Sequence, residues 1–308
     1  MNSIHAFSWI TLHVPGILIT GHMQWYQAII LSVVILFSFL PKGMPMRFLG
    51  VIVCIPLLYH PSAVDLGHAR LVFMNVGQGL SILIKTKHHL LVYDTGPKFF
   101  TGGDVAQSII IPYLYYHGWK NIDGLLVSHG DADHSGGAKT LREQFTIPLV
   151  WTSDLKRVPK AMRCERGQEW HWDGVDFKIL YPDSAVKFHG NNRSCVLKMS
   201  IGETSALLVG DIEVEAENYL IDHLSDELST DVLSVPHHGS KTSSSENFLN
   251  ATHPRYAVFS YGFLNRFHFP HSVVVQRYAN HHIQTRTTEN GPVSIDMTAT
   301  GLTIFPEP

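Results

Sequence analysis

The chain has 308 residues, and its hydrophobic content of 45% is enough for a substantial core in one large domain or two small ones. The formal net charge is −3, so no overall basic field attracts nucleic acid, and any such binding has to rest on local patches. The three cysteines form no CxxC pair, which excludes a zinc ribbon and a disulfide framework. A bridge between Cys164 and Cys195 would need an oxidising compartment, and the sequence favours buried thiols instead.

Residues 1–60 differ from the rest of the chain. The runs 25–40 (WYQAIILSVVILFSFL) and 48–59 (FLGVIVCIPLLY) are almost uncharged. A membrane span needs about 20 apolar residues, so these runs with their flanks predict spans at about 24–41 and 47–59, the second packed on its neighbours. Buried core helices of a soluble protein are the alternative interpretation.

The short loop between the two apolar runs contains Lys42 and Arg47. Because positively charged loops stay in the cytoplasm, the chain after Tyr59 is predicted to lie in the periplasm or outside the cell. Residues 61–69 are typical of a linker, and residues 70–308 form the following domain. The expected location is therefore the cell inner membrane, in a multi-pass protein whose C-terminal domain faces outward.

From residue 70 the pattern is that of an α/β domain. Short apolar runs bounded by turn residues predict strands. These strands are expected at 70–75, 80–85, 89–94, 122–128, 149–153, 175–181, 195–201, 205–209, 231–235, 257–261, 283–288, 293–298 and 301–305. Helices are expected at 104–117, 138–144, 213–223 and 271–281, and a capping box formed by Ser243 and Glu246 starts another short one.

The stretch LLVSHGDADHSGG, residues 125–137, is the most informative in the chain. A short apolar run predicts a buried strand that leads directly into His129, Asp131, Asp133 and His134. Imidazole and carboxylate groups together suit zinc or manganese. A loop at the end of a strand lets the side chains diverge, so His129 and Asp131 are expected to face one metal, and Asp133 and His134 a second.

Further candidate ligands also follow predicted strands. Asp211 comes after the apolar run 206–209, and His237 comes after 232–235. A carboxylate such as Asp211 can bridge two cations, which a neutral imidazole cannot do. Taken singly, Asp211 has a helix N-cap as its less favoured alternative, and His237 could equally be a core histidine. Asp94, at the end of another strand, is predicted to hold a ligating histidine or the loop in place.

Several stretches together resemble a known superfamily. SHGDADHSGG resembles the HxHxDH signature of the metallo-β-lactamase superfamily, with Asp131 in place of the second His. With GG after it, this variant is similar to the C-terminal domain of the ComEC-type DNA-internalisation channels of natural transformation. The resemblance covers about residues 24–305 and includes NVGQG (75–79), YDTG (93–96), VGDIE (209–213), VPHHGSKTSSS (235–245) and NRFHFPH (265–271).

This resemblance implies an αβ/βα sandwich preceded by a short helical membrane region. It also implies two divalent metal ions, manganese or zinc, with Asp211 as the bridge and His237 on the side of Asp133 and His134. The expected catalytic residues are Asp133 and Asp211. The expected metal ligands are His129, Asp131, Asp133, His134, Asp211 and His237.

The sequence departs from the family pattern at two places. The family commonly has Asp where Asn75 stands, so a supporting role for Asn75 implies a weaker charge partner. The family also supplies a further His between the first motif and the bridging Asp, where this chain has GNNRSC, residues 190–195. One metal site is therefore expected to be rich in oxygen ligands and more tolerant of manganese than of zinc.

A nuclease needs contacts to its substrate as well as metals. His238 and Ser240 follow His237 and are predicted to contact a substrate phosphate. His268 is a second candidate, although a role in a surface turn suits it equally. A basic stretch between two predicted strands suits a polyanion, or is a solvated loop; its expected substrate-binding members are Lys156, Arg157 and Lys160.

Together these features predict a metal-dependent nuclease domain of a membrane DNA-uptake channel, which degrades the strand that is not imported. The expected partners are DNA, the membrane and the remaining spans of a larger channel. Two alternatives remain open: a catalytically inactive domain that guides DNA, and a small-molecule metallo-hydrolase of the same superfamily. Metal content separates the inactive domain from the two enzymes, and substrate class separates those enzymes from each other.

Overall fold

The computed structural model of the chain describes residue 32, residues 64–100 and residues 102–306. Apart from residue 32, both predicted membrane spans lie outside these residues. No helix within the described ranges is long and apolar enough to cross a membrane. The chain divides into two compact units, Ser62–Pro112 with Asn121–Pro308, and Met1–Pro61 with Tyr113–Lys120. In the second unit, the rings of Tyr113 and His117 pack with their centroids 4.3 Å apart.

The first unit contains an eight-stranded sheet in the order β15-β14-β1-β2-β3-β4-β5-β6. The pairs from β15 to β3 are antiparallel, and the pairs from β3 to β6 are parallel. Its strands are β1 (Ala69–Phe73), β2 (Ile82–Lys85), β3 (Leu90–Tyr93), β4 (Gly124–Val127), β5 (Leu149–Thr152), β6 (Met162–Arg163), β14 (Val293–Thr298) and β15 (Gly301–Pro306).

A seven-stranded sheet in the order β13-β12-β11-β10-β9-β8-β7 packs against it. Strands β13 to β10 are parallel, and the pairs from β10 to β7 are antiparallel. Its strands are β7 (Glu169–Trp172), β8 (Val175–Tyr181), β9 (Val196–Ile201), β10 (Thr204–Leu208), β11 (Val232–Ser234), β12 (Tyr256–Phe259) and β13 (Gln284–Thr287).

The main core lies between the two sheets. Phe73 and Tyr93 of the first sheet and Phe177 and Met199 of the second are at most 1% exposed and belong to one apolar cluster. Burying each such side chain stabilises the fold by about 1.5–3 kcal/mol relative to exposure. The Tyr93 hydroxyl also donates a hydrogen bond of 2.6 Å to the Cys195 carbonyl, so the sheets are joined by a polar contact at the core's edge.

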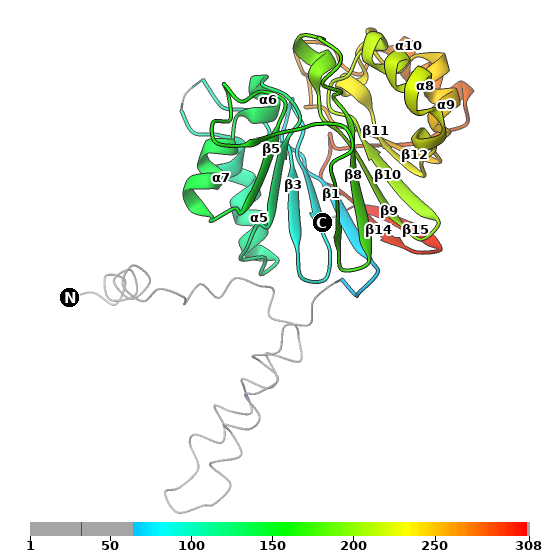
Figure 1. Cartoon of the computed structure of the whole chain (residues 1–308). Helices are drawn as coiled ribbons and strands as arrows, with labels where there is room; N and C mark the ends of the chain where they lie inside the picture. The colour runs from blue at the N-terminus through cyan, green and yellow to red at the C-terminus, as the bar shows by residue number, and fades with distance from the viewer. Residues whose placement is uncertain (1–31, 33–63, 101, 307–308) are drawn as a thin grey trace, which may run out of the picture. The chain divides into compact units, whose positions relative to one another are not determined.

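Helices cover the outer faces of both sheets (Figure 1). A second apolar cluster joins the seven-stranded sheet to α8, α9 and α10. The predicted αβ/βα sandwich is therefore confirmed. The helical segments are η2 (Ala106–Ile110), α5 (Ile111–Tyr116), α6 (Ala132–Ser135), α7 (Ala138–Gln144), η3 (Gly190–Arg193), α8 (Val214–Leu228), η4 (Pro236–Gly239), α9 (Glu246–Thr252) and α10 (Ser272–Asn280).

Most predicted elements are present, but the short helices α6, η3 and η4 were not predicted, and further differences concern two strands and the ends of two helices. Strands β6 and β7 were not predicted, because β6 is only two residues long and the alternation of polar residues with tryptophan in β7 extends over only four residues. Helix α8 continues to Leu228, five residues past its predicted end at 223. The N-cap of α9 is Ser245, whose hydroxyl accepts from the Phe248 amide, whereas the Ser243 hydroxyl donates to the Ile212 carbonyl.

The preference for buried thiols was wrong, because Cys164 and Cys195 form a disulfide. Cys164 follows β6 of the first sheet, and Cys195 precedes β9 of the second. Both residues are at most 1% exposed, and their Cα atoms are 6.0 Å apart. The bridge therefore ties the two sheets together.

A buried carboxylate also ties the sheets, at the opposite strand ends. Asp173, in the β7–β8 turn, accepts hydrogen bonds from the Thr86 hydroxyl (2.6 Å) and the His88 amide (2.8 Å) in the β2–β3 turn. Desolvation raises the pKa of Asp173, but these hydrogen bonds and those from the His89 and His88 rings outweigh it, so the pKa lies well below its ordinary value.

Candidate metal centre

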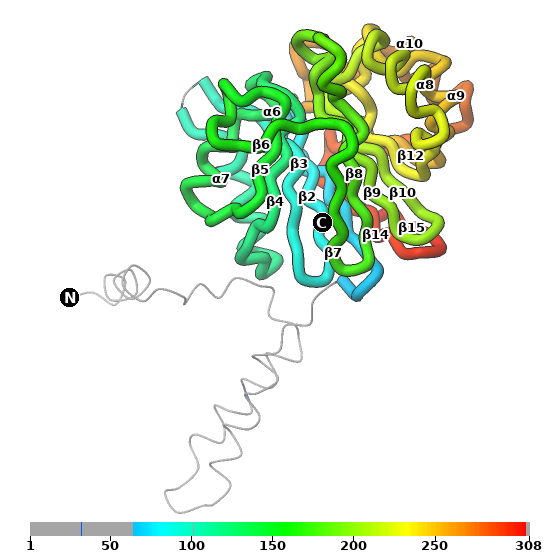
Figure 2. The backbone as a smooth tube through the Cα atoms, viewed as in Figure 1, coloured from blue at the N-terminus to red at the C-terminus, as the bar shows by residue number. Residues whose placement is uncertain are grey.

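The site lies where parallel strands of both sheets end. Asp94 follows β3, His129 follows β4, Asp211 follows β10, and His238 lies just after β11. Carboxyl ends of neighbouring parallel strands lie at one edge of a sheet, and packing the two sheets brings both edges together. Figure 2 traces the backbone through β3, β4 and β10, the strands that precede Asp94, His129 and Asp211.

Asp94 organises the first side of the site. Its carboxylate is fully buried and accepts hydrogen bonds from the Ser128 amide (2.6 Å), the Ser128 hydroxyl (2.7 Å) and His134 Nδ1 (2.7 Å). A carboxylate can only accept here, so Nδ1 of His134 carries the proton. Nε2 of the neutral ring is therefore a lone pair pointing away from Asp94, as expected for a group that orients a metal-binding histidine.

The same reasoning determines which ring nitrogen of His129 carries the proton. This residue is 2% exposed. Its Nδ1 lies 3.0 Å from the Ser128 hydroxyl and 3.3 Å from the Ser194 hydroxyl. Both hydroxyl protons are used elsewhere, by the Asp94 carboxylate and the Asn191 carbonyl, so each oxygen accepts from His129. Nε2 of His129 is consequently a lone pair, and it is buried with no partner among the described residues.

His238 approaches from the second sheet. Its Nδ1 donates a hydrogen bond of 2.7 Å to the Ser260 carbonyl, so in the neutral ring its Nε2 carries a lone pair. That atom lies 3.2 Å from Nε2 of His134, 3.5 Å from Asp211 Oδ2 and 3.6 Å from Asp133 Oδ2. The backbone reaches this position through positive φ angles at His237 (48°) and His238 (55°), a local strain of the kind found at functional sites.

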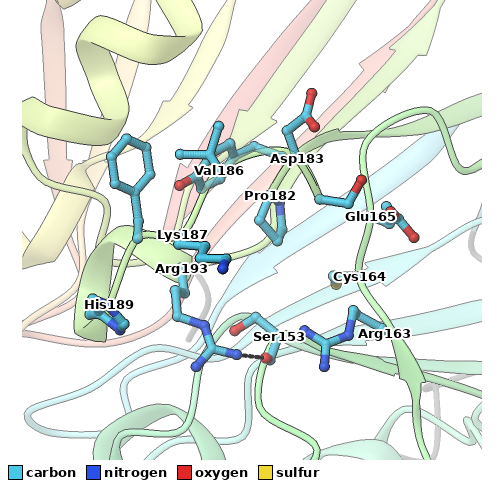
Figure 3. A pocket seen from close by; sticks show the side chains of 13 residues that line it. Ser153, Arg163, Cys164, Glu165, Pro182, Asp183, Val186, Lys187, His189 and Arg193 are labelled. Carbon is cyan, nitrogen blue, oxygen red and sulfur yellow. Dashed lines mark hydrogen bonds between the residues drawn. The ribbon is translucent and has the colours of Figure 1, made fainter.

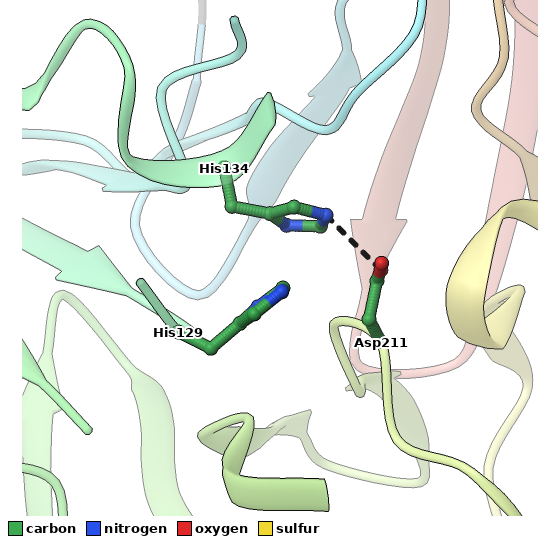
Figure 4. A group of neighbouring side chains, drawn as sticks. All are labelled: His129, His134 and Asp211. Atoms are coloured by element: carbon green, nitrogen blue, oxygen red, sulfur yellow. Dashed lines mark ion pairs between the residues drawn. The ribbon is translucent and has the colours of Figure 1, made fainter. Parts of the chain in front are cut away.

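Five side chains thus place nitrogen or oxygen atoms that can bind a metal close to one another. Potential ligand atoms lie within 4.8 Å of one another in two groups, His129, His134 and Asp211, and Asp133, His134 and His238. Figure 4 shows the first group, with both imidazoles and the carboxylate pointing toward a common point. Asp211 Oδ1, buried and 3.1 Å from His134 Nε2, makes no hydrogen bond within the described part of the chain.

The electrostatics of the cluster also favour a cation. Burial lowers the pKa of His238, but the Asp211 and Asp133 carboxylates outweigh it and raise that pKa to about 9. Burial raises the pKa of Asp211, yet His134 and His238 hold it well below its ordinary value. The site therefore stabilises positive charge, which protons or a metal can supply. A cation also explains the unpartnered His129 Nε2 and Asp211 Oδ1, so these residues fit divalent metal ions.

The structure distributes the predicted ligands differently from the expectation. His134 lies in both groups, and His238, expected to contact substrate, takes the place beside Asp133 and His134 that was expected for His237. His237 Nε2 is 3.8 Å from Asp211 Oδ2, while its Nδ1 lies 3.3 Å from Glu213 Oε1. Two consecutive histidines follow β11, and only the tight turn of η4 decides which of them faces the cluster.

Asp131 lies at the rim of the cluster. Its Oδ2 is 3.7 Å from His129 Nε2, and its side chain is 62% exposed. In place of the family's further His, η3 presents Asn191, whose amide nitrogen lies 3.4 Å from His237 Nε2. Ser194, one turn further on, holds both His129 Nδ1 and the Asp211 amide. Ser128 and Ser194 were not predicted, because a lone serine beside a motif carries no distinctive signal.

The remaining residues predicted to support the site or bind substrate, Asn75, Ser240 and His268, make other contacts or are exposed. Asn75 caps its own turn, accepting from the Gly77 amide (3.2 Å), and does not reach the imidazoles. The Ser240 hydroxyl pairs with that of Thr242 (3.0 Å). His268 is exposed, and its neighbour Phe269 instead packs on His237 and His238, with ring centroids 5.6 and 6.3 Å away.

The basic residues of the predicted polyanion site are exposed. They are Lys156, Arg157 and Lys160. Arg157 lies against the metal loop, since a Cβ placed on Gly130 would come within 2.9 Å of its Cγ. Gly136, which follows the loop, makes room for a neighbouring segment of the chain, because a Cβ at this position would meet the Lys98 amide at 2.3 Å.

The sequence and fold place the chain in a known class. Residues 74–262 match the Metallo-beta-lactamase superfamily, and the chain belongs to this superfamily. Among solved structures, the metallo-β-lactamase fold protein YhfI from Bacillus subtilis superposes with a TM-score of 0.52 at 10% identity, covering 74% of this chain and 99% of that one. At this identity the similarity concerns the fold alone.

Curated relatives define the branch of the superfamily more narrowly. The chain is 35% identical over 253 residues to competence protein ComA of Neisseria gonorrhoeae, covering 81% of this chain and 35% of that protein. It is 38% identical over 223 residues to recombination protein 2 of Haemophilus influenzae, covering 72% of this chain and 27% of that protein. The predicted resemblance to ComEC-type competence proteins is confirmed, and the chain spans about a third of the length of these relatives.

Proposed function

We propose that this domain is a metal-dependent nuclease that hydrolyses phosphodiester bonds of DNA as part of a membrane DNA-uptake channel, and that it degrades the strand that is not imported. One observation carries the hydrolase part. Nδ1 of His129, His134 and His238 is in each case committed to an outer partner, so three Nε2 atoms face the Asp133 and Asp211 carboxylates, and each neutral ring offers its lone pair to a metal ion there.

These five residues would hold two divalent ions, manganese or zinc. Asp211 offers its two oxygens in different directions, Oδ1 toward His134 and Oδ2 toward His238, as a bridging carboxylate does. The chemistry that such an ion pair supplies is activation of a water nucleophile and clamping of the attacking and leaving oxygens. Asp94 and the Ser128 hydroxyl orient the rings, while the exposed Asp131 remains a candidate for the open side of the site.

DNA as substrate rests on two further observations. The curated relatives that cover this domain include a competence protein and a recombination protein. Exposed Lys156, Arg157 and Lys160 follow β5, and Arg157 lies beside Gly130 of the metal loop, where a bound strand would pass. Lysine and arginine supply the sequence-independent attraction to the phosphate backbone.

An outward-facing domain is supported by the disulfide. A buried Cys164–Cys195 bridge persists in an oxidising environment such as the periplasm, and the cytoplasm would keep it reduced. Lys42 and Arg47 support the same side, because positively charged loops favour the cytoplasm. The remaining spans of a larger channel would then be the membrane partners of this domain.

The test is cleavage of labelled single- and double-stranded DNA by the purified full chain, with manganese, magnesium and zinc in turn. We expect cleavage with at least one metal and none by D211A. The matched control is D231N, because Asp231 is also largely buried but caps the opposite ends of the strands, where it accepts from the Ser205 amide (3.0 Å). A wild-type chain that binds metal but cleaves no nucleic acid would favour the DNA-guiding alternative.

A further inference from the structure

A cavity of about 400 Å³ opens on the side of η3 that carries Arg193. Its volume is within the range of about 300–1,000 Å³ found for ligand sites, so it has room for a nucleotide. Three cationic side chains line it, Arg163 at the end of β6, Lys187 from the loop after β8, and Arg193 from η3. Figure 3 shows Arg163 and Arg193 extending toward Ser153 from opposite sides.

The charge of this cavity is positive. Of its two carboxylates, Asp183 is already engaged by Arg166 (3.3 Å), the Tyr219 hydroxyl (2.9 Å) and the Ala185 amide (2.9 Å). Three cations therefore stand against Glu165 alone. An excess of positive charge in a concave, partly desolvated site favours a bound anion over free solution.

A hydrogen bond restrains Arg193 in a conformation in which it can bind such an anion. Its guanidinium donates one hydrogen bond to the Ser153 carbonyl, and the side chain is half-buried. A guanidinium has five N–H donors in a rigid fork, so the others remain for a ligand at a small further entropy cost. Arginine in this state matches a phosphate better than an unrestrained lysine does.

The cavity and the metal centre share two structural supports. The Ser153 hydroxyl donates to the Ser128 carbonyl (2.7 Å), and Ser128 holds His129. Arg193 directly precedes Ser194, which contacts both His129 and the Asp211 amide. Segment η3 therefore connects the two places, because its Asn191 lies 3.4 Å from His237 Nε2 and its Arg193 lines the cavity.

We infer that this cavity binds one nucleotide of the substrate strand close to the cleaved bond, with its phosphate held by Arg163, Lys187 and Arg193. The inference rests on the proposed nuclease function and assigns that function a binding subsite. It differs from the exposed patch of Lys156, Arg157 and Lys160, because a cavity with a fixed arginine positions one phosphate, whereas an exposed patch attracts the backbone without defining its register.

The test measures binding of a fluorescein-labelled 12-nucleotide oligothymidine to the purified full chain in EDTA, so that no cleavage occurs. The variant is R163Q/K187Q, two exposed side chains whose loss leaves the core intact. For single strands, the logarithm of the binding constant falls by about 0.7 per phosphate contact for each tenfold rise in salt concentration. Losing one or two contacts should lower that slope by about 0.7–1.4 and weaken binding about 5- to 25-fold at 0.1 M salt.

The matched control is K139Q/R286Q, which also removes one lysine and one arginine charge, but from α7 and the edge strand β13. It should change Kd less than twofold. The single variant K187Q should show part of the effect. The inference is overturned if R163Q/K187Q binds like the control, or if the wild type does not bind the oligonucleotide. Cleavage of the same oligonucleotide by the wild type with manganese is measured separately, so failure of the nuclease proposal is distinguished from failure of the subsite.

Discussion

Replacing Asp94 by Asn tests how the fold sets the metal affinity of His134. Asn differs from Asp by one NH2 group and tolerates the positive φ of 59° at this position, so the backbone should not change. In the wild type, Asp94 Oδ1 accepts from the Ser128 amide. Asp94 Oδ2 accepts from the Ser128 hydroxyl and from His134 Nδ1. An amide can satisfy only one of these two sets of donors.

Both orientations of the amide carry a cost. If its NH2 faces His134, the ring must accept at Nδ1, which moves the proton to Nε2 and removes the lone pair from the metal site. If its NH2 faces the Ser128 amide, two buried donors oppose each other at a cost of about 1–3 kcal/mol. Metal affinity should therefore fall about 10- to 100-fold, which corresponds to about 1.4–2.8 kcal/mol.

The assay is titration of the metal-free chain with zinc and manganese in competition with a chelating indicator, with thermal melting of each variant. D104N is the matched control, because Asp104 is also buried and accepts from the Gln107 amide (2.9 Å) and the Thr140 hydroxyl (2.5 Å), away from the imidazoles. We expect D104N to lower the melting temperature while retaining wild-type metal affinity. A folded D94N chain that binds metal like the wild type would refute the tautomer argument.

Three further results are expected. H238A should lose at least tenfold more metal affinity than H237A in the same titration, and the reverse order would return His237 to the cluster. C164S/C195S should destabilise the domain by about 3–4 kcal/mol, since the bridge closes a loop of 31 residues, and a melting temperature unchanged by reduction would contradict this. Because its pKa is lowered on folding, Asp173 contributes stability that is complete above about pH 4 and is lost as the pH falls further. D173N should therefore be less stable than the wild type at pH 7, with a gap that narrows below pH 4 in melting curves, and a constant gap would argue against it.

The sequence predicted the part of the site that depends on strand ends. An apolar run that stops at a polar residue marks the carboxyl end of a buried strand, and for parallel strands these ends meet at one edge. That reasoning placed His129, Asp94 and Asp211 in neighbouring positions. The assignment of His237 and His238 depended instead on a turn with two positive φ angles, where strand periodicity no longer says which side chain faces inward.

The disulfide was missed for a related reason. Cys164 directly follows β6, a strand of only two residues that is too short to show any apolar alternation. The same strand ends with Arg163 at the cavity beside η3, so the charge of Arg163 could be recognised in the sequence but not its partners, Lys187 and Arg193. Contacts between residues distant in sequence decide both features.

The number of divalent ions bound per chain at saturation, measured by equilibrium dialysis and elemental analysis of the full chain, tests the metal centre itself. The two ligand groups that share His134 predict two ions for the wild type. Asp211 supplies an oxygen to each side, so D211A should lose both ions together while D231N retains two. A wild-type chain that binds no ion at saturation, or a D211A chain that still binds two, would contradict the proposed centre.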